Sequence, residues 1–515
     1  MAVRVTIKTS TYFDSVSLMS LSTKANQIEG VDQAVVAMGT EMNKGVLRNV
    51  GLFVPQIDEA GAGDLMIVVK AADDEACALA LEKIEALMKT RRKSGGAKEM
   101  SFATLSSACE HVPEANLAIV AVPGEYAARE ARQALERNLH VLMFSDNVSI
   151  EDEVALKQLA HDKGLLMMGP DCGTAILGNT GLCFANAVRR GNIGIVGASG
   201  TGSQEISVRI HDFGGGISQL IGTGGRDLSE RVGGIMMIDG IRALAADPAT
   251  AVIVLVSKPA PKSVEKKVLA EIKACGKPVV VCILGGAEDA VVEAGGHFAR
   301  ATKEAALKAV LLSGIAESGI NKRALNLPLI AETRLKLTAE QKYIRALMCG
   351  GTLCDELMFL AKEKFDNVYS NIAKDPAHRM RDLDVSQEHT FIDFGDDDFT
   401  RGRPHPMIDP SLRIERFKRE AQDPSVGVIV MDFIIGFGAH ADPVGVTLPS
   451  IMEAKALAAQ QGRHLEILAY VLGTEMDTPA LNEQVKKLES AGVTIASSCT
   501  NAGLLARGFV EKDVK

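Results

Sequence analysis

The stretch NIGIVGASGTGSQEI (residues 192–206) decides the fold of this 515-residue chain, because an apolar strand pattern runs through a glycine turn into a helix pattern. A second stretch, YIRALMCGGTLCDEL (residues 343–357), repeats that order. Both copies carry G-T-x-x-x-E where the strand ends, at Gly200–Glu205 and at Gly351–Glu356. The repeat predicts a duplicated unit with a glycine turn at the N-terminus of each helix.

Later segments extend the duplication. DPATAVIV (residues 247–254) matches DPSVGVIV (423–430), and each is followed by a strand pattern that ends in glycine, KPVVVCILG (277–285) and HLEILAYVLG (464–473). Strands rich in Val, Ile and Leu with little alternation indicate a parallel sheet that is covered on both faces. We therefore expect an α/β protein with two flavodoxin-like units, at residues 190–330 and 335–510.

Two further domains are expected ahead of these units. Residues 1–95 alternate strand and helix patterns in the order β-α-β-(α)-β-α, which predicts a small α+β (ferredoxin-like) domain. The basic, period-free run Arg91–Gly96 is interpreted as a linker. Residues 100–188 show strands that alternate with helices and predict a Rossmann-like domain.

Composition excludes several function classes. The net charge is -9, only 4% of residues are aromatic and Trp is absent, so nucleic acid is not expected as the main ligand. The nine cysteines are scattered without C-x-x-C, and the histidines lack H-E-x-x-H spacing, so we expect no metal site. Without a signal peptide or a long apolar run, we expect a cytoplasmic protein that does not enter a membrane.

The glycine turns are candidate anion sites. Amide groups at a helix N-terminus, together with the helix dipole, bind phosphate or carboxylate. The first candidate set is Ser199, Gly200, Thr201 and Gly202, and the second is Gly350, Gly351 and Thr352. The structural alternative is a tight, capped strand–helix turn without a ligand.

Three other residues are candidates for catalysis or for holding the substrate. Arg226 lies in the glycine turn IGTGGRDLSE, and Lys258 follows a strand, so both are placed to meet an anion. An ion pair within the loop or a solvated lysine are the alternatives. His440, in IIGFGAHADP, is a candidate for proton transfer, against a capping or packing role. The polar segment Asp393–Pro410 either lines a site or forms a solvated loop.

The motifs GPDCGTAILGNTGL (169–182), NIGIVGASGTGSQEI and KPVVVCILGG resemble the α subunit of succinyl-CoA synthetase. Residues 340–505 resemble the C-terminal ligase domain of the β subunit. This fusion, with YFDSVSLMSLS (12–22) and VVAMGTEMNK (35–44) in front, is similar to the FdrA family of predicted acyl-CoA synthetases. The resemblance implies that residues 100–188 are of the CoA-binding type and that both later domains are of the succinyl-CoA-synthetase type.

The departures from that family's ligases are specific. GAEDAVVEAGG (286–296) stands where those ligases carry an active-site histidine loop, and His297 belongs to the following strand. The glycine loop that grips CoA and the nucleotide-binding half are also missing. The family likeness implies a subunit of an oxalurate/oxamate carbamoyltransferase in allantoin and purine breakdown, which forms carbamoyl phosphate from phosphate and works with partner subunits.

Two alternatives stay open at this stage. The first is an acyl-CoA synthetase in which partner subunits supply the missing parts, with CoA as ligand. The second is a non-catalytic scaffold or regulatory protein in which the ligase-like units serve assembly alone.

Overall fold

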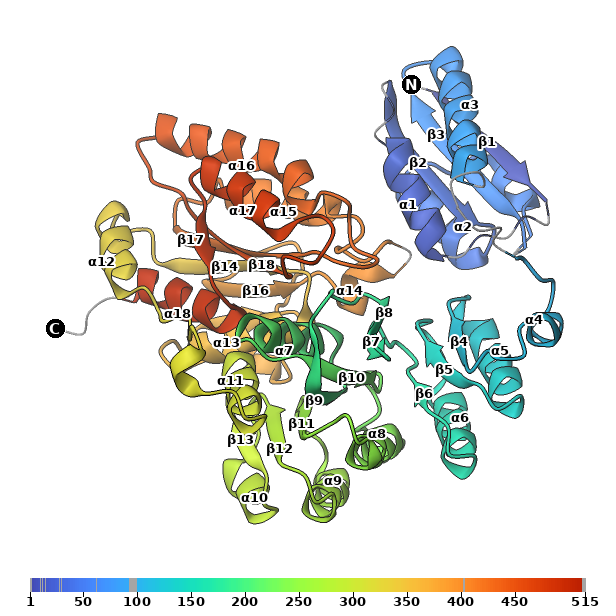
Figure 1. The fold of residues 1–515 in the computed structure, drawn as a ribbon. Helices are drawn as coiled ribbons and strands as arrows, with labels where there is room; N and C mark the ends of the chain where they lie inside the picture. The colour runs from blue at the N-terminus through green and yellow to red at the C-terminus, as the bar shows by residue number, and fades with distance from the viewer. Residues whose placement is uncertain are drawn as a thin grey trace. The chain divides into compact units, whose positions relative to one another are not determined.

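The computed structural model describes residues 2–9, 11, 13, 15–26, 28, 30–61, 63–91, 100–401 and 403–511 (Figure 1). Tyr12 of the family motif and residues 92–96 of the expected linker lie outside the described residues. The chain divides into two compact units. The first comprises residues 1–115 and 400–404, and the second comprises residues 116–399 and 405–515.

The first unit is a small α+β layer. Its three strands form an antiparallel sheet in the order β1-β3-β2. Alternate residues of the central strand face opposite sides, so Ile67 and Val69 pack under α1 and α3, whereas Met66 and Val68 pack against residues of α2 and η1. The elements are β1 (Ala2–Lys8), α1 (Ser15–Asn26), β2 (Val31–Met38), α2 (Glu41–Asn49), η1 (Pro55–Glu59), β3 (Leu65–Ala71), α3 (Asp74–Arg91) and α4 (Leu105–His111).

The expected α+β order of the first unit is confirmed. The elements β1-α1-β2-β3-α3 are the first five of the ferredoxin-like order β-α-β-β-α-β, with α2 and η1 inserted between the second and third strands.

The second unit begins with a three-stranded parallel sheet, β4-β5-β6. A hairpin, β7-β8, then adds to the edge of the next sheet through an antiparallel pairing with β10. These elements are β4 (Leu117–Val120), α5 (Gly124–Glu136), β5 (His140–Met143), α6 (Ile150–Asp162), β6 (Met167–Met168), β7 (Thr174–Leu177) and β8 (Thr180–Cys183).

The first of the two larger sheets follows the hairpin. Its parallel strands run in the order β13-β12-β11-β9-β10, which is the flavodoxin-like order 2-1-3-4-5 read from the other edge. Its elements are β9 (Arg190–Gly197), α7 (Gly200–Asp212), β10 (Ile217–Gly222), α8 (Ile235–Ala246), β11 (Val252–Ser257), α9 (Lys262–Ala274), β12 (Val279–Ile283), α10 (Glu288–Glu293), β13 (His297–Ala299) and α11 (Thr302–Leu312).

The second large sheet repeats this order as β19-β18-β17-β14-β16, with β15 added at the edge. The predicted duplication is thus confirmed strand by strand. After η2 (Glu317–Gly319) and α12 (Leu327–Lys336), its elements are β14 (Tyr343–Met348), α13 (Gly351–Lys362), β15 (Val368–Ser370), η3 (Pro376–His378), β16 (His389–Asp393), α14 (Asp397–Thr400), α15 (Ser411–Glu420), β17 (Val426–Ile434), α16 (Pro443–Gln460), β18 (Glu466–Leu472), α17 (Leu481–Ser490), β19 (Thr494–Ala496) and α18 (Cys499–Val510).

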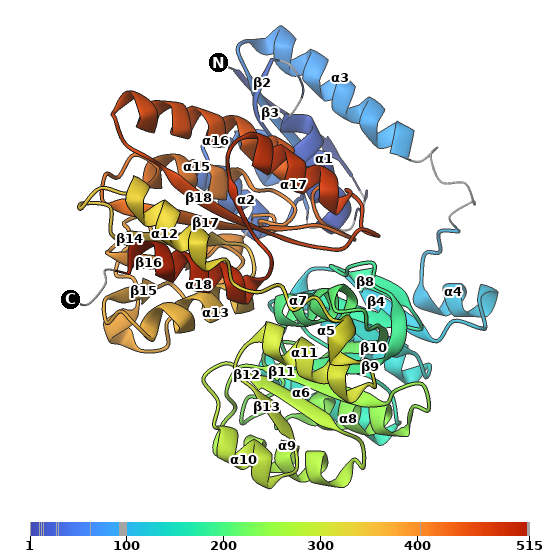
Figure 2. The same cartoon turned by 60° about the vertical axis from the view of Figure 1, so that its left-hand side comes forward.

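Four helices join the two repeats. Helices α7 and α11 of the first repeat lie beside α13 and α18 of the second, between the two sheets (Figures 1 and 2). Because α13 is the counterpart of α7 and α18 that of α11, the repeats meet through equivalent helices. The duplicated motif lies at the centre of this contact.

A buried ion cluster ties the first sheet of the second unit to the next. The Lys157 ammonium of α6 donates to Glu153 Oε1 (2.9 Å), Asp227 Oδ1 (2.8 Å) and the Thr223 carbonyl (2.9 Å), and the Lys157 side chain is completely buried. Asp227 also accepts the amides of Met236 and Met237 at the start of α8. Asp227 of the predicted IGTGGRDLSE turn is therefore a packing and capping residue.

Replacement of Lys157 tests this cluster. In Lys157→Met the buried Asp227 loses its cation and Glu153 keeps only its pair with Arg226, so we expect the free energy of unfolding to fall by about 3–5 kcal/mol in denaturant titrations. The matched control is Lys266→Met on the exposed face of α9, with an expected change within about 0.5 kcal/mol. Equal stability of the two variants would contradict a structural role for Lys157.

Candidate functional site

The two glycine turns meet end to end. The Ser199 hydroxyl accepts the Gly202 amide (3.0 Å), which caps α7, and it also hydrogen-bonds to the Thr352 hydroxyl at the start of α13. A Cβ added at Gly202 would lie 2.9 Å from Thr352 Cγ2, and one added at Gly350 would lie 3.1 Å from Thr201 Cβ. We call this contact, formed by residues 199–202 and 350–352, the helix-end junction.

The helix-end junction carries donors that no group of the protein uses. In the described part of the chain, the amides of Gly200 and Thr201 in α7 and of Gly351 and Thr352 in α13 have no hydrogen-bond partner. Such first-turn amides cannot be satisfied within their own helix, and they carry the positive end of the helix dipole. Two sets of these donors meeting at one place form a suitable environment for an anion.

The two turns are closed differently. In the second copy the amides of Cys349 and Gly350 donate to Asp432 of β17, at 2.8 Å and 3.0 Å. Asp432 is completely buried and pairs with Arg413 (2.8 Å). The Gly350 amide is therefore already engaged by an internal carboxylate, whereas in the first copy the Ser199 hydroxyl caps the turn.

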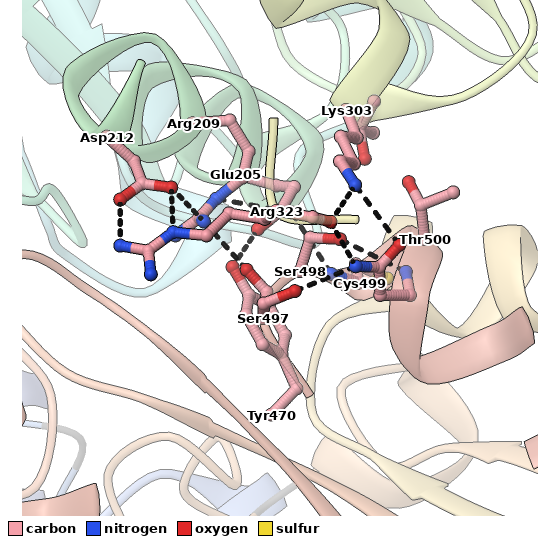
Figure 3. Close-up of polar contacts among 12 residues, drawn as sticks. Glu205, Arg209, Asp212, Lys303, Arg323, Tyr470, Ser497, Ser498, Cys499 and Thr500 are labelled. Atoms are coloured by element: carbon pink, nitrogen blue, oxygen red, sulfur yellow. Dashed lines mark hydrogen bonds and ion pairs between the residues drawn. The ribbon is translucent and has the colours of Figure 1, made fainter. Parts of the chain in front are cut away.

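The glutamates of the G-T-x-x-x-E motif cross between the repeats. Glu205 Oε1 accepts the amide of Cys499, the first residue of α18, at 3.2 Å, and Glu205 Oε2 accepts the Tyr470 hydroxyl (Figure 3). Glu356 accepts the amide of Thr302, the first residue of α11, at 3.3 Å, and the Thr302 hydroxyl at 2.6 Å. Each glutamate thus caps the last helix of the other repeat.

Further polar contacts surround Glu205. Arg209 donates to Asp212 Oδ2 (3.0 Å) and to the Ser497 carbonyl (2.8 Å), and Lys303 donates to Asn501 Oδ1 (3.2 Å), as Figure 3 shows in part. Burial raises the pKa of Glu205, and the charge of Arg209 opposes this rise. The sequence points to these glutamates only through their spacing. Each glutamate lies four residues, or about one helical turn, after the threonine of its G-T-x-x-x-E motif, and so on the same face of the helix.

The three candidate substrate residues have partners within the protein. Arg226 donates to the Val148 carbonyl (2.8 Å) and pairs with Glu153 (2.9 Å), which matches the alternative of an ion pair. Lys258 pairs with Asp355 of α13 at 2.7 Å, and its side chain is 46% exposed, so an anion in solvent can reach it. The Nδ1 atom of His440 accepts the Asp442 amide (2.9 Å), and burial lowers the pKa of His440.

In the described residues only Lys258 of these three pairs with a residue of α7 or α13, and its partner Asp355 lies three residues beyond the helix-end junction. Lys258 reaches α13, but in the described residues no hydrogen bond or ion pair joins Arg226 or His440 to either glycine turn. The roles of all three in substrate binding or catalysis stay predictions.

Asp393, in the segment Asp393–Pro410, was not singled out from the sequence. It ends β16, and its Oδ2 would lie 2.6 Å from a Cβ added at Gly351, so this carboxyl group lies against the first residue of α13. Burial raises the pKa of Asp393 to about 7. An aspartate at the carboxyl end of a parallel strand was the only sequence signal for its place.

No histidine stands where a phosphohistidine relay would need one. Residues 284–296 contain no histidine, and His297 opens β13, an edge strand that β12 and β11 separate from β9. His405 lies near Gly395, but its Nδ1 accepts the Met407 amide (3.2 Å), which leaves the proton on Nε2. Burial lowers the pKa of His405 to about 4, so the ring is neutral at pH 7. Because the Nδ1 lone pair accepts the Met407 amide and Nε2 carries the proton, neither nitrogen offers a free lone pair to a phosphoryl group.

Three family descriptions match parts of the chain. Residues 188–285 match "CoA binding domain", and residues 347–509 match "CoA-ligase". Residues 1–103 match "AllF, heavy metal-associated domain". The CoA-binding description falls on β9–β12, where the sequence led us to expect a ligase-like domain. The fold and these matches define a protein of the acyl-CoA synthetase-like, succinyl-CoA ligase-like class, as expected.

The relatives of this chain include a subunit named as a succinate--CoA ligase. "Succinate--CoA ligase [ADP-forming] subunit alpha 2" of Archaeoglobus fulgidus is 28% identical over 236 residues, which are 43% of this chain and 79% of that subunit. The "Uncharacterized protein YahF" of Escherichia coli K12 is 62% identical over 515 residues, 99% of each chain. The chain belongs to the family of that protein. The crystal structure of PH0766 from Pyrococcus horikoshii OT3 aligns over 77% of this chain and 83% of its own, with 16% identity and a TM-score of 0.33.

The N-terminal domain has no pair of cysteine or histidine residues that could form a thiolate or imidazole metal site. Residues 1–103 contain one cysteine, Cys77, and no histidine. Cys77 is buried, and its thiol contacts the carbonyls of Val69 and Ala2. Soft metal ions require several thiolate, thioether or imidazole ligands together. The described residues contain no group of three or more potential ligands of the His, Cys, Asp and Glu types.

The sheet β4-β5-β6, expected from the sequence to be of the CoA-binding type, is not where the CoA-binding description falls. Residues 100–116, ahead of β4, contribute helix α4 and no strand. The sheet β4-β5-β6 therefore lacks a preceding strand–glycine turn–helix unit in the described residues. Among the described helices, none combines the length and the apolar composition that crossing a membrane requires.

The crossed glutamates predict a pH-dependent stability. Burial raises the pKa of Glu356 to about 7 from 4.5, so between these values the native state holds a proton that the unfolded state releases. The free energy of unfolding therefore falls as the pH rises through this window, by up to about 1.4 kcal/mol per pH unit for this one group.

Glu356→Gln should remove this contribution, because the amide keeps an acceptor for Thr302 and does not titrate. We expect a flatter dependence of the unfolding free energy on pH between pH 5 and 7, measured by denaturant titration. Glu332→Gln, at an exposed position of α12, is the matched control and should behave like the wild type. An unchanged pH slope in Glu356→Gln would rule out Glu356 as the source.

Proposed function

We propose that this protein is a subunit of a carbamoyl or acyl transferase that uses phosphate as the acceptor. The specific reaction is oxalurate plus phosphate to oxamate plus carbamoyl phosphate, in the breakdown of allantoin and purines. The observation that carries the proposal is the helix-end junction, in which two sets of first-turn amides without partners meet. The match of residues 1–103 to an AllF domain supports the link to allantoin by name.

The proposed reaction mechanism follows from the amide donors at the helix-end junction and from the missing histidine loop. Without a histidine acceptor, phosphate has to attack the carbamoyl carbon directly. The amides of Gly200, Thr201, Gly351 and Thr352 would hold the phosphate and stabilise the charge of the tetrahedral intermediate, since oriented donors in a water-poor site act strongly on developing charge. Lys258, exposed beside α13, would contact the anionic oxamate group.

Partner subunits are part of the proposal. The matched relative from Archaeoglobus fulgidus is itself named as a subunit. Here partners would bring the remaining walls of the active site, and the complex would work in the cytoplasm.

The reaction is tested with the chain and its co-expressed neighbouring gene products. We expect the purified complex to form carbamoyl phosphate from oxalurate and phosphate without CoA or nucleotide. Carbamoyl phosphate is measured by coupling to a carbamate kinase, with a phosphate-free mixture as control. No product above that control in a stable, folded complex would exclude the reaction.

Gly202→Ala tests the role of the helix-end junction. The new Cβ would lie 2.7 Å from Ser199 Oγ and 2.9 Å from Thr352 Cγ2, so the two helix ends have to separate. We expect phosphate affinity, measured by calorimetry, and the rate of product formation to fall at least about tenfold, as a misplacement near 1 Å can cost more than that.

Gly319→Ala is the matched control, since no atom lies within 4 Å of a Cβ added at Gly319. It should keep the wild-type affinity and rate. If Gly202→Ala folds and keeps both properties as well, the junction is not the phosphate site and the scaffold alternative is favoured.

A CoA ligase remains a second candidate, because the CoA-binding and CoA-ligase descriptions together match residues 188–285 and 347–509. This alternative requires CoA to bind to the chain or to its complex and a nucleotide-dependent thioester to form. We expect calorimetric titration with CoA to give no binding heat, with the known CoA-binding α subunit of a succinyl-CoA ligase as positive control. Saturable CoA binding would favour the ligase.

A further inference from the structure

Asp393, the last residue of β16, is held by hydrogen bonds beside Gly351, the first residue of α13. Its backbone amide donates to Asn371 Oδ1 (2.9 Å), and its carbonyl accepts from Asn371 Nδ2 (3.0 Å). Its Oδ1 accepts the Gly395 amide (2.8 Å), which leaves Oδ2 turned toward Gly351. The carboxyl group therefore has one fixed orientation, with one oxygen facing the helix end where the proposed phosphate would lie.

The surrounding charges leave Asp393 without a cation of its own. Lys258, whose positive charge favours the ionised form of Asp393, is already paired with Asp355 at 2.7 Å. Asp355 of α13 and Asp396 of the following loop add negative charge, and the imidazole of His405 is neutral. Buried among these groups, the ionised carboxylate is disfavoured, and a second anion beside it would disfavour it further.

We propose that Asp393 is the acid–base residue of the carbamoyl transfer, and that an anion binds at the start of α13 only while Asp393 carries its proton. This inference rests on the proposed function for its chemical step. In that state the carboxylic acid can donate a hydrogen bond to the anion, whereas the carboxylate would repel it.

Asp393 alone can carry out both proton transfers of the proposed reaction. A phosphate oxygen of HPO₄²⁻ forms a bond to the carbamoyl carbon, and the C–N bond to the oxamate nitrogen breaks. Asp393 gives its proton to that nitrogen, which leaves as the amide of oxamate. The proton of the phosphate then returns to the Asp393 carboxylate, so the products are oxamate and carbamoyl phosphate dianion and the residue is restored. A carboxyl group that titrates near the working pH is suited to both transfers.

The binding part of the inference predicts a pH dependence. With a pKa of about 7, Asp393 is mostly protonated at pH 6 and mostly ionised at pH 8. The apparent affinity for an anion scales with the protonated fraction, so it should fall about tenfold between these pH values. Binding at pH 8 should also take up close to one proton per anion.

The test uses sulfate, because sulfate does not titrate in this range as phosphate does. Calorimetric titrations of the full chain at pH 6 and pH 8, at constant ionic strength and in two buffers of different ionisation enthalpy, give both the affinity and the number of protons taken up. We expect the tenfold weakening and the proton uptake in the wild type and in Asp398→Asn, an exposed control in the nearby helix α14. Asp393→Asn should bind sulfate equally at both pH values without proton uptake.

The outcomes separate the inference from the proposed function. If the wild-type protein binds sulfate equally at both pH values and takes up no proton, the role of Asp393 is overturned. The proposed phosphate site is not affected by that result. Absence of sulfate binding at both pH values overturns both. If sulfate binding takes up a proton but the complex forms no carbamoyl phosphate, the proton-dependent anion binding at Asp393 is supported and the proposed reaction is overturned.

In the active complex, Asp393→Asn should lower the rate by about 100-fold or more, as the loss of a positioned acid–base group does. A wild-type rate in that variant would overturn the catalytic part. Because the wild-type proton uptake needs no variant, the inference stays testable even if Asp393→Asn does not fold.

Discussion

The contact between the N-termini of α7 and α13 is the constraint on which the centre of the molecule depends. Each helix end carries roughly half a positive charge, so two such ends in contact repel each other. Buried carboxylates compensate for this: Asp432 binds the amides that precede α13, and Asp393 lies against Gly351. Glu205 and Glu356, one turn further along, accept hydrogen bonds from the opposite repeat. The carboxyl groups of these four residues thus lie around the place where a substrate anion is proposed to bind.

This arrangement explains why the acidic groups near the junction are difficult to ionise. Asp393 and Glu356 both have a pKa raised to about 7, with burial as the largest cause in each case. A site that needs a negative ligand while several carboxylates lie close by has to keep some of them protonated. The electrostatics of the junction therefore depend on the protonation of buried carboxyl groups as well as on the fixed amide donors of the two helix ends.

Much of the fold was predictable because its signals are local. Strand–turn–helix patterns and the repeated G-T-x-x-x-E motif lie within short stretches, and the parallel sheets follow from uninterrupted apolar strands. Asp393, Asp432 and the crossing of Glu205 to α18 were out of reach. Their partners are tens to hundreds of residues away, and no pattern of spacing records which carboxylate meets which amide. Arg226 shows the same limit: an arginine in a glycine turn fits a ligand contact and an internal ion pair equally well in sequence, and the structure pairs it with Glu153.

The crossed glutamates also bear on how such a chain can be divided in evolution. Each buried glutamate has hydrogen-bond partners in the opposite repeat, although Glu356 also accepts the Thr500 hydroxyl of its own repeat (2.6 Å) and α18 is also capped by its own Ser498. A gene that encoded one half alone would produce a domain whose buried glutamate loses its partners in the other half. Joining the halves in one polypeptide through residues 313–342 guarantees equal amounts of both and supplies each with its complement at synthesis. One chain therefore always contains the two repeats in a one-to-one ratio, which two separately encoded subunits would not guarantee.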